Sequence, residues 1–490
     1  MLERSKDRRI WFVLLAIVLV GSGFRLWGLD TQSFWLDELC SWLDCHQKSL
    51  SSLIKFVSLS EGNPPGYFIL LHYVQYLGDS EFVLRLPSAV CGILSIGVIF
   101  LIGRRLFSWR EGLIASTLMA VLECPVHYSQ EARPYAMLLL FSMLSVYFLI
   151  DIVEHLRMQD EIPLLVFGAY LFVAVVCSYL HYYGIYFIAL QQGIAFLLVY
   201  RSKNGLIFFV LTLIVVLFCY LPWISYFWGH LHSHPMTDWI RAPEGLFVSL
   251  KSFFAFLFID SERLVLIVVV AYVYVLVRCI NVFFRSHSRK DLLLLGWLII
   301  PFAGAYLVSV LTPLHILINR YLIISLPAAY LLLARAFVHI PIDSFRKTIV
   351  LFIFVAVSCY HLVFGLKYYS APRNDQFREA ANFVIQNDTS FRGSILIGSA
   401  WYTEHLNYYF QSKGFDKLIK YNLVIERQKE LAIQEVNKGQ VKYLWYVYMH
   451  IDPDLSFLDF VKTTMHEVKH KSYFGGAVYL FQKKDPDDKS

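Results

Sequence analysis

The sequence predicts a polytopic α-helical membrane protein, with about eleven spans within a range of eleven to thirteen and a C-terminal extracytoplasmic α/β domain. Of its 490 residues 57% are hydrophobic and only 16% are charged, which is more apolar surface than a soluble chain of this length can bury. Its apolar runs are long enough to cross a bilayer. The net charge of +6 comes from short basic clusters between these runs, so it indicates membrane topology, and we expect no nucleic-acid partner.

The basic clusters predict the orientation of each span, because cytoplasmic loops are enriched in Lys and Arg. The chain leaves the cytoplasm through a span from Ile10 to Leu29, returns through Phe82 to Leu101, and leaves again through Leu113 to His127. Further inside groups follow at Arg157, Arg201 with Lys203, Arg285 with Arg289 and Lys290, and Arg346 with Lys347.

The same alternation places the chemically varied segments on the outer face of the membrane. They are residues 30–81, 131–134, 181–184, 229–244 and 311–321. The inner loops are short and basic. We therefore expect a multi-pass protein of the cell (inner) membrane whose active site lies on the extracytoplasmic face.

Three apolar segments on the outer side are too short to span a bilayer. Leu50 to Val57 and Gly66 to Leu77 are separated by Pro64 and Pro65, and we expect two surface helices there. Leu246 to Ile259 is of similar length, and the predicted number of spans depends on keeping it outside.

The chain becomes mixed polar and apolar near residue 371. We expect a transmembrane domain in residues 1–370, with 30–81 as its first outer loop, and a soluble α/β domain in residues 371–490. Helical spacing of Phe377, Ala380, Ala381 and Val384 behind the possible caps Asn374 and Asp375 predicts a helix. Strands are predicted at Ser394 to Gly398, Val441 to Tyr448 and Gly475 to Phe481.

The segment "SFWLDELCSW", residues 33–42, contains the first candidate catalytic acids, Asp37 and Glu38. On a helix two adjacent side chains point about 100 degrees apart, so they cannot form a facing acid and base pair. A single carboxylate suits sugar transfer from a phosphate carrier, which needs one base, better than glycoside hydrolysis, which generally needs two opposed carboxylates. A solvated loop acid or a helix cap is the alternative for Asp37.

The segment "YSQEARPY", residues 128–135, contains the next candidates, Glu131, Arg133 and Tyr135. Ionised groups beside apolar runs are costly unless they pair, face water or take part in chemistry. Glu131 is a third candidate catalytic acid, and Arg133 is a candidate phosphate ligand; the alternative is that they pair with each other.

Several histidines on the predicted outer face could hold a divalent metal, although the sequence requires no cofactor. They are His181, beside Tyr182 and Tyr183, and His230, His232 and His234. Interfacial histidines without a metal are the more frequent case.

Five segments in this order resemble one known family. They are "FWLDELCSW", "EGNPPGYFILLHYV", "LRLPSAV" before "GRRLF", "YSQEARPYAMLLLFSMLS" and "NRYLIISLPAAYLLLA". They resemble the polyprenyl-phosphate-sugar-dependent glycosyltransferases of the GT-C fold, and among these the protein O-mannosyltransferase-like branch that includes the lipid A aminoarabinose transferases. The resemblance covers Ile10 to Lys367.

The resemblance implies a sugar donor linked to polyprenyl phosphate and an acceptor that is an envelope glycan, a lipid or a protein. It also implies bound membrane lipid, inversion at the sugar, and a catalytic base at Asp37. The chain departs from the family where Asn63 precedes Pro64 and Pro65, because His-Pro-Pro is common there. A role that the family assigns to this histidine is therefore in doubt in this chain. We keep Asn63, which takes its position, as a substrate-binding candidate.

Arg320 is the strongest candidate ligand for the donor phosphate, since it opens a predicted span at the outer face and a guanidinium binds phosphate oxygens in pairs. An interfacial anchor is the alternative. We also expect His181, Tyr182, Tyr135 and Arg133 to bind substrate. The rival class is a transporter or lipid flippase, which would show ionisable groups at mid-bilayer and broken helices in inverted repeats. A membrane scaffold without catalytic activity is a further alternative.

Overall fold

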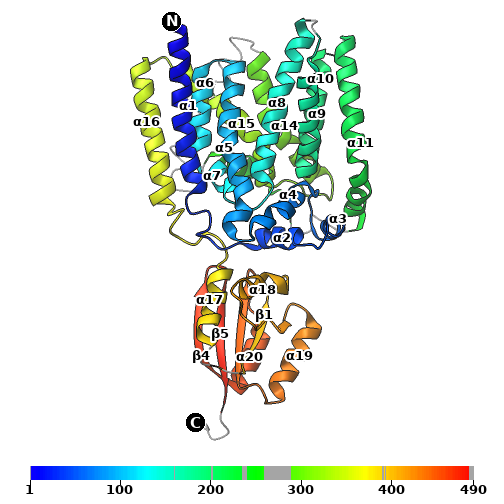
Figure 1. The fold of residues 1–490 in the computed structure, drawn as a ribbon, viewed down its shortest axis with the longest axis vertical. Coiled ribbons are helices and arrows are strands. Elements are labelled where there is room, and N and C mark those ends of the chain that lie inside the picture. Colours follow the sequence, from blue (N-terminus) through cyan, green and yellow to red (C-terminus); the bar gives the residue numbers. More distant parts are fainter. Residues whose placement is uncertain are drawn as a thin grey trace. The chain divides into compact units, whose positions relative to one another are not determined.

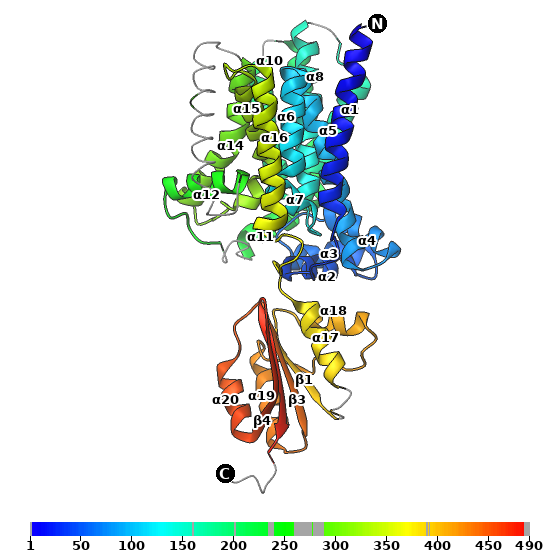
Figure 2. The ribbon, with the colours of Figure 1, turned by 90° about the vertical axis from the view of Figure 1, so that its left-hand side faces the viewer.

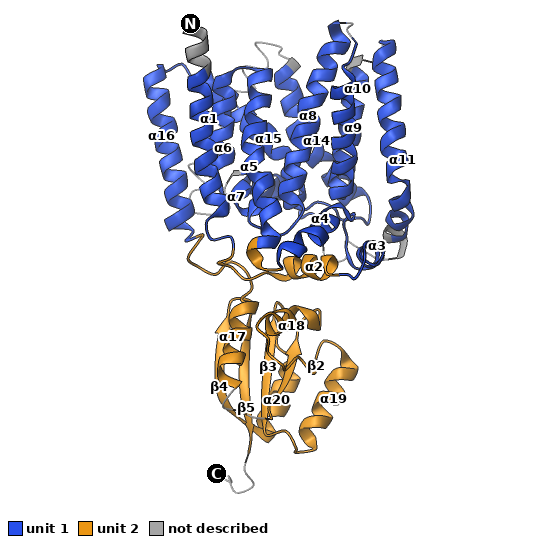
Figure 3. Cartoon of the chain, in the orientation of Figure 1, with its two compact units in different colours: residues 1–29, 47–78, 83–367 blue, residues 30–46, 79–82, 368–490 orange. Residues whose placement is uncertain are grey.

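The computed structural model describes residues 2–158, 161–199, 202–233, 240–258, 277, 289–388, 391 and 393–484. It divides into two compact units (Figures 1 and 3). The helical unit comprises residues 1–29, 47–78 and 83–367, and the α/β unit comprises residues 30–46, 79–82 and 368–490. The first outer loop is therefore shared between the units, because its first helix groups with the C-terminal chain.

The helical unit confirms the predicted polytopic membrane protein. Among the described residues, seven helices are long and apolar enough to cross a membrane. They are α1 (Leu2–Leu26), α5 (Glu81–Leu106), α8 (Tyr135–Met158), α11 (Lys203–Ser233), α14 (Arg289–Leu311), α15 (Leu326–Val338) with the 3-10 turn η2 (Asn319–Ser325), and α16 (Ser344–Tyr360) with the π turn η3 (His361–Gly365). Arg285, Arg201 and most of residues 259–288 lie outside the described residues, so the total of about eleven stays a prediction.

Helices α9 (Leu164–Leu180) and α10 (Tyr182–Val199) pack beside α8 and are joined at His181. The junction is tight: a Cβ on Gly184 would lie 1.8 Å from the Cys177 carbonyl oxygen, so only glycine fits. Gln191 and Gln192, the polar residues deep in this region, donate to Ser145 and Tyr170. Gln191 also accepts from the Tyr170 hydroxyl at 3.4 Å, whereas the buried Gln192 oxygen has no hydrogen-bond partner among the described residues.

The predicted span from Leu113 to His127 is broken. Helix α6 (Trp109–Val121) ends at Leu122, whose backbone is extended, and α7 (Glu123–Ser129) follows at once. Pro125 explains the break, because its ring would clash with the Val121 carbonyl in a continuous helix.

Short helices occupy the apolar segments that cannot span. They are α3 (Leu50–Ser60), α4 (Gly66–Val74) with the 3-10 turn η1 (Gln75–Leu77), and α12 (Leu246–Phe258). Gly66 lies against the Tyr179 carbonyl oxygen, where an added Cβ would approach to 2.7 Å. The two predicted helices on either side of the proline pair are therefore present, and their orientation along a membrane surface stays a prediction.

The α/β unit contains a five-stranded sheet of order β2-β1-β3-β5-β4. The strands are β1 (Ile395–Ser399), β2 (Tyr421–Asn422), β3 (Tyr443–Met449), β4 (Met465–Tyr473) and β5 (Gly476–Lys483). β1 pairs in parallel with β2 and β3, whereas β5 is antiparallel to β3 and β4. The three predicted strands are confirmed; β4 was not predicted, because it is a mostly exposed, charged edge strand.

Helices cover both faces of this sheet, as Figure 2 shows. α17 (Phe377–Asp388) and α18 (Thr403–Ser412) lie on one face, and α19 (Glu426–Asn437) and α20 (Leu455–Thr464) lie on the other. The four apolar residues that predicted α17 are buried. Asn374 and Asp375 do not have the predicted capping contacts: the Asn374 amide donates to the Ser33 carbonyl, and the Asp375 carboxylate contacts His450.

Candidate active site

Helix α2 (Leu36–Cys45) carries Asp37 and Glu38 in its first turn and belongs to the α/β unit. Acidic side chains stabilise this position because the helix N-terminus carries partial positive charge. Glu38 is fully buried and accepts a hydrogen bond from the Trp35 N–H at 3.4 Å. Glu38 therefore has a structural contact that caps its own helix, whereas the Asp37 side chain is only half-buried.

Residues of the C-terminal chain hold α2 in place. The Phe34 N–H donates to the Tyr409 hydroxyl at 2.7 Å, and Trp42 packs on Tyr408 with ring centroids 4.7 Å apart. Cys40 lies 3.8 Å from the ring of His405. Cys40 and Cys45 do not form a disulfide with each other.

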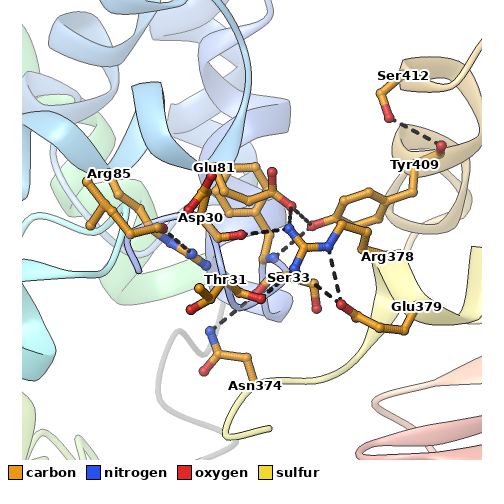
Figure 4. Close-up of polar contacts among 12 residues, drawn as sticks. Asp30, Thr31, Ser33, Glu81, Arg85, Asn374, Arg378, Glu379, Tyr409 and Ser412 are labelled. Carbon is orange, nitrogen blue, oxygen red and sulfur yellow. Dashed lines mark hydrogen bonds and ion pairs between the residues drawn. The ribbon is translucent and has the colours of Figure 1, made fainter. Parts of the chain in front are cut away.

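Arg378 joins the start of the α2 segment to residues 79–82 (Figure 4). Its guanidinium donates to Glu81 at 3.1 Å and to the carbonyl oxygens of Asp30 at 2.8 Å and Thr31 at 2.5 Å. The Tyr409 hydroxyl donates to the same Glu81 oxygen at 3.0 Å. One arginine on α17 thus ties together two pieces of the first outer loop.

A histidine-carboxylate pair lies in the same unit. The His450 Nδ1 is 2.6 Å from the Asp375 carboxylate. The hydrogen bond to Asp375 raises the pKa of His450, and the nearby charge of Asp37 acts in the same direction. His405 behaves in the opposite way, since burial and the proximity of His450 lower its pKa to about 4.

In the helical unit, the "YSQEARPY" segment is fastened to the end of α1. Arg25 is fully buried and donates to the carbonyl oxygens of Met119 and Ala120, where α6 breaks, and to the Ser129 hydroxyl. Gln130 donates in return to the carbonyls of Phe24, Arg25 and Trp27 at 3.1, 3.2 and 2.9 Å. These bonds fix the residues directly before Glu131.

Glu131 is buried within a group of cations. One carboxylate oxygen lies 3.1 Å from the His127 Nε2, one helical turn earlier. Burial alone would raise the pKa of Glu131, but the attraction of His127, Arg320 and Arg133 outweighs burial, so this pKa lies below its ordinary value. The second oxygen is buried and accepts no hydrogen bond from the described residues.

Arg133 does not form its ion pair with Glu131. Its guanidinium lies 3.1 Å from Glu61, and both side chains are buried. Asn63 approaches the other Glu61 oxygen at 3.5 Å and is itself buried. Asn63 thus supports the acidic partner of Arg133 in the position where a histidine is common in the resembled family.

Arg320 lies among aromatic rings. Its guanidinium carbon is 5.8 Å from the ring centroids of both Tyr135 and Tyr321, a distance suited to cation–π attraction. The rings of Tyr135 and Tyr321 are stacked, and Tyr321 contacts His181 with centroids 4.4 Å apart.

His181 is neutral in this environment. Burial and the charges of Arg133 and Arg320 lower its pKa to about 3. Its Nδ1 accepts a hydrogen bond from the Tyr183 N–H at 3.0 Å, so Nε2 carries the proton. That Nε2 is buried and has no hydrogen-bond partner among the described residues.

Tyr182 has its described contacts on another helix. Its hydroxyl accepts from the Trp223 indole at 3.2 Å, and its ring lies 5.0 Å from Phe227. No group of three His, Cys, Asp or Glu able to hold a metal occurs among the described residues. The side chains of His230, His232 and His234 lie outside those residues, so the possible divalent metal stays a prediction.

The fold therefore gathers five of the predicted residues in the helical unit, namely Glu131, Arg133, Tyr135, His181 and Arg320, from segments far apart in sequence. Asp37 and Glu38 lie in the α/β unit. Sequence reasoning missed Glu61, His127, Tyr321 and His450. Only His127 left a usable signal, because it precedes Glu131 by four residues in a helical segment.

Comparison with known proteins supports the resemblance to glycosyltransferases that the sequence predicted. Residues 62–226 match the family described as dolichyl-phosphate-mannose-protein mannosyltransferase. No curated protein matches the chain in sequence. The structure is similar to ArnT from Cupriavidus metallidurans bound to undecaprenyl phosphate, with 13% sequence identity, a TM-score of 0.59, and coverage of 96% of this chain and 98% of that chain.

Two other solved structures share the fold. The archaeal oligosaccharyltransferase AglB from Archaeoglobus fulgidus, in complex with an inhibitory peptide and a dolichol-phosphate, has 10% identity and a TM-score of 0.52 over 98% of this chain and 75% of that chain. Arabinofuranosyltransferase AftD from Mycobacteria has 13% identity and a TM-score of 0.52 over 98% of this chain and 40% of that chain.

The resemblance predicted from sequence is confirmed. One segment of the chain matches the mannosyltransferase family, and the chain as a whole shares the ArnT fold, a polytopic helical membrane unit with a C-terminal mixed α/β region.

Proposed function

We propose that this protein transfers a sugar from a polyprenyl-phosphate carrier to an acceptor outside the cytoplasm, with inversion at the anomeric carbon. The acceptor is an envelope glycan, a lipid or a protein. The observation that carries the proposal is the group of half-buried Arg320, buried Arg133 and neutral His181 within a GT-C fold. Guanidinium groups and an imidazole N–H are donors suited to a phosphate and its sugar.

The donor phosphate is assigned to Arg320. The guanidinium of Arg320 lies over two tyrosine rings, and its charge acts on Glu131 and His181. Arg133 is paired with Glu61 at 3.1 Å. Undecaprenyl phosphate and dolichol-phosphate are bound in the structures of ArnT and AglB, which share this fold. The buried Nε2–H of His181 supplies a further donor to the carrier.

The reaction needs one proton acceptor. Asp37 takes the proton of an acceptor hydroxyl or amine, whose oxygen or nitrogen attacks the anomeric carbon as the bond to the phosphate oxygen breaks. The polyprenyl phosphate leaves with its negative charge, which Arg320 stabilises. Attack opposite the leaving phosphate inverts the configuration.

A deletion strain tests the proposal. Mass spectrometry of its envelope glycans and lipids should show the loss of a sugar-bearing species that the wild-type chain restores and Asp37→Asn does not. An envelope extract of the deletion strain supplies both the carrier-linked sugars and the acceptor. Purified protein added to this extract should release polyprenyl phosphate. Movement of a carrier lipid from one leaflet of a liposome to the other, without release of polyprenyl phosphate, would instead establish a flippase.

The extracytoplasmic face of the site is part of the proposal. In a cysteine-free background, a membrane-impermeant thiol reagent should label a cysteine at Lys413, just after α18, in intact cells. A cysteine at Lys203, the first residue of α11 and on the predicted inner side, should be labelled only after permeabilisation. Labelling of both only after permeabilisation would place the α/β unit in the cytoplasm and contradict the proposal.

A further inference from the structure

The α/β unit receives α2 at a particular edge of its sheet. β1 and β3 are parallel neighbours. His405, which lies 3.8 Å from Cys40 of α2, follows the carboxyl end of β1, and His450 follows the carboxyl end of β3. In open parallel sheets this edge is where ligands and catalytic groups are positioned. Here part of it is occupied by the helix that carries Asp37.

His450 is held at this edge by several features. Its φ of +65° is in the left-handed region, which is uncommon for a residue with a side chain and often marks a functional position. Its N–H donates to the Gly475 carbonyl at 2.7 Å, and its Nδ1 contacts Asp375 at 2.6 Å. A Cβ on Gly475 would lie 2.1 Å from the Asp375 carboxylate, so glycine is required for this arrangement.

Three titratable groups surround His450. Asp375 precedes α17, Asp37 lies on α2, and His405 lies on α18. Both carboxylates favour the charged imidazole, whereas buried His405 is neutral at physiological pH. The charge of Asp37 therefore favours the protonated form of His450, whose Nδ1 is already committed to Asp375.

We propose that His450, fixed by Asp375, is a positioning residue for Asp37, so that the C-terminal α/β unit completes the catalytic base of the glycosyltransferase. The inference rests on the proposed function, because it assumes that Asp37 accepts the proton. The positive imidazole attracts the Asp37 carboxylate and holds the first turn of α2 against the sheet edge. Sugar transfer should then depend on the protonation of a residue more than 400 positions away in sequence.

The pH dependence has a defined sign. Because the pKa of His450 is raised above 6.5, its charge is complete below that value and is lost as the pH rises through the raised value. The rate of polyprenyl phosphate release should fall over that alkaline range. Positioning by one partly exposed charge corresponds to a change of roughly 5- to 30-fold in rate.

The test measures release of polyprenyl phosphate between pH 5.5 and 9 by the full-length protein in the extract assay described above. His450→Gln should lower kcat and remove the alkaline fall. Asp375→Asn keeps the imidazole but removes the partner that raises its pKa, so the fall should move toward acid pH. His470→Gln is the matched control, because His470 is an exposed histidine of the same unit that stacks on Tyr479 of β5; it should keep the wild-type profile.

The outcomes separate this inference from the proposed function. An inactive Asp37→Asn variant together with an unchanged profile in Asp375→Asn, or no alkaline fall in the wild type, overturns the role of His450 alone. An active Asp37→Asn variant overturns the assignment of the base and the inference with it. If His450→Gln does not fold, the Asp375→Asn profile still decides, because a purely structural contact would not move the alkaline fall.

Discussion

Glu131 and Asp37 are both acidic side chains, but the protein holds them in different ways. Glu131 is buried in the helical unit, where His127, Arg133 and Arg320 balance its charge and lower its pKa. Asp37 is half-buried on a short helix of the α/β unit, and its charge favours the protonated form of His450. A carboxylate stabilised by several cations is a weaker proton acceptor. The comparison therefore favours Asp37 as the base and Glu131 as a group that organises the phosphate-binding cations.

The largest expected effect sharpens this contrast directly. Asp37→Asn keeps the size of the side chain but removes the proton acceptor, so kcat for sugar transfer should fall by at least about 100-fold. Glu38→Gln is the matched control, because its amide oxygen can still accept from Trp35. Equal losses in the two variants would show that α2 tolerates no change in charge and would remove the special role of Asp37.

Arg320→Ala should act on donor binding as well as on turnover. Loss of the guanidinium removes a charge-assisted contact to phosphate, so we expect KM for the carrier-linked sugar to rise and kcat to fall, together by roughly 30-fold. Arg320→Lys should recover only part of the loss, since a lysine lacks the paired donors. Arg346→Ala, an exposed arginine of the same unit paired with Asp343, should leave both parameters unchanged.

Glu131→Gln tests the other half of the comparison, the role of Glu131. It leaves the surrounding cations in excess, and we expect transfer to fall by about 10-fold with a loss of thermal stability. Because the pKa of Glu131 is lowered, its stabilising contribution is complete above its ordinary value near 4.5 and is lost as the pH falls through the lower value. The difference in Tm between wild type and variant should therefore be largest at pH 7 and should shrink below about pH 4. A constant difference would contradict the ionised state of Glu131.

Arg25→Lys should give the smallest effect on activity. A lysine can reach one or two of the carbonyl oxygens that Arg25 binds, but not the Ser129 hydroxyl at the same time. The expected loss of stability is about 1 to 3 kcal/mol, from buried acceptors left without a donor, measured as a lower Tm. Transfer by the folded fraction should fall only a few-fold, because Gln130 still fastens the segment before Glu131.

Much of the fold was predictable from sequence. Span length, basic clusters and the short apolar runs at Ile395–Ser399 and Tyr443–Met449 are local signals, and they predicted the helical unit and the main strands correctly. The break at Leu122 was missed although Pro125 was visible, because the apolar run continues through it. The edge strand β4 was missed because its residues are nearly all polar and exposed.

The site was predictable in its members but not in its pairings. Glu131 and Arg133 are two positions apart, and sequence reasoning considered them as a pair. The fold instead gives Arg133 to Glu61 and Glu131 to His127. The ion-pair partners of Arg133 and Glu131 depend on how α3, α4 and α7 pack. No local sequence pattern predicts this packing. The grouping of α2 with the C-terminal chain was invisible for the same reason.

The division of the first outer loop has a consequence for how the protein is made. Phe34 donates to Tyr409, which lies 375 positions later in the chain. At about 5 to 20 residues per second, a ribosome needs roughly 20 to 75 seconds to travel from one to the other. During that time α2 exists without the sheet that holds it, while the spans between them are already being inserted. The helix that carries the candidate base is thus among the first segments synthesised and among the last to reach its final contacts.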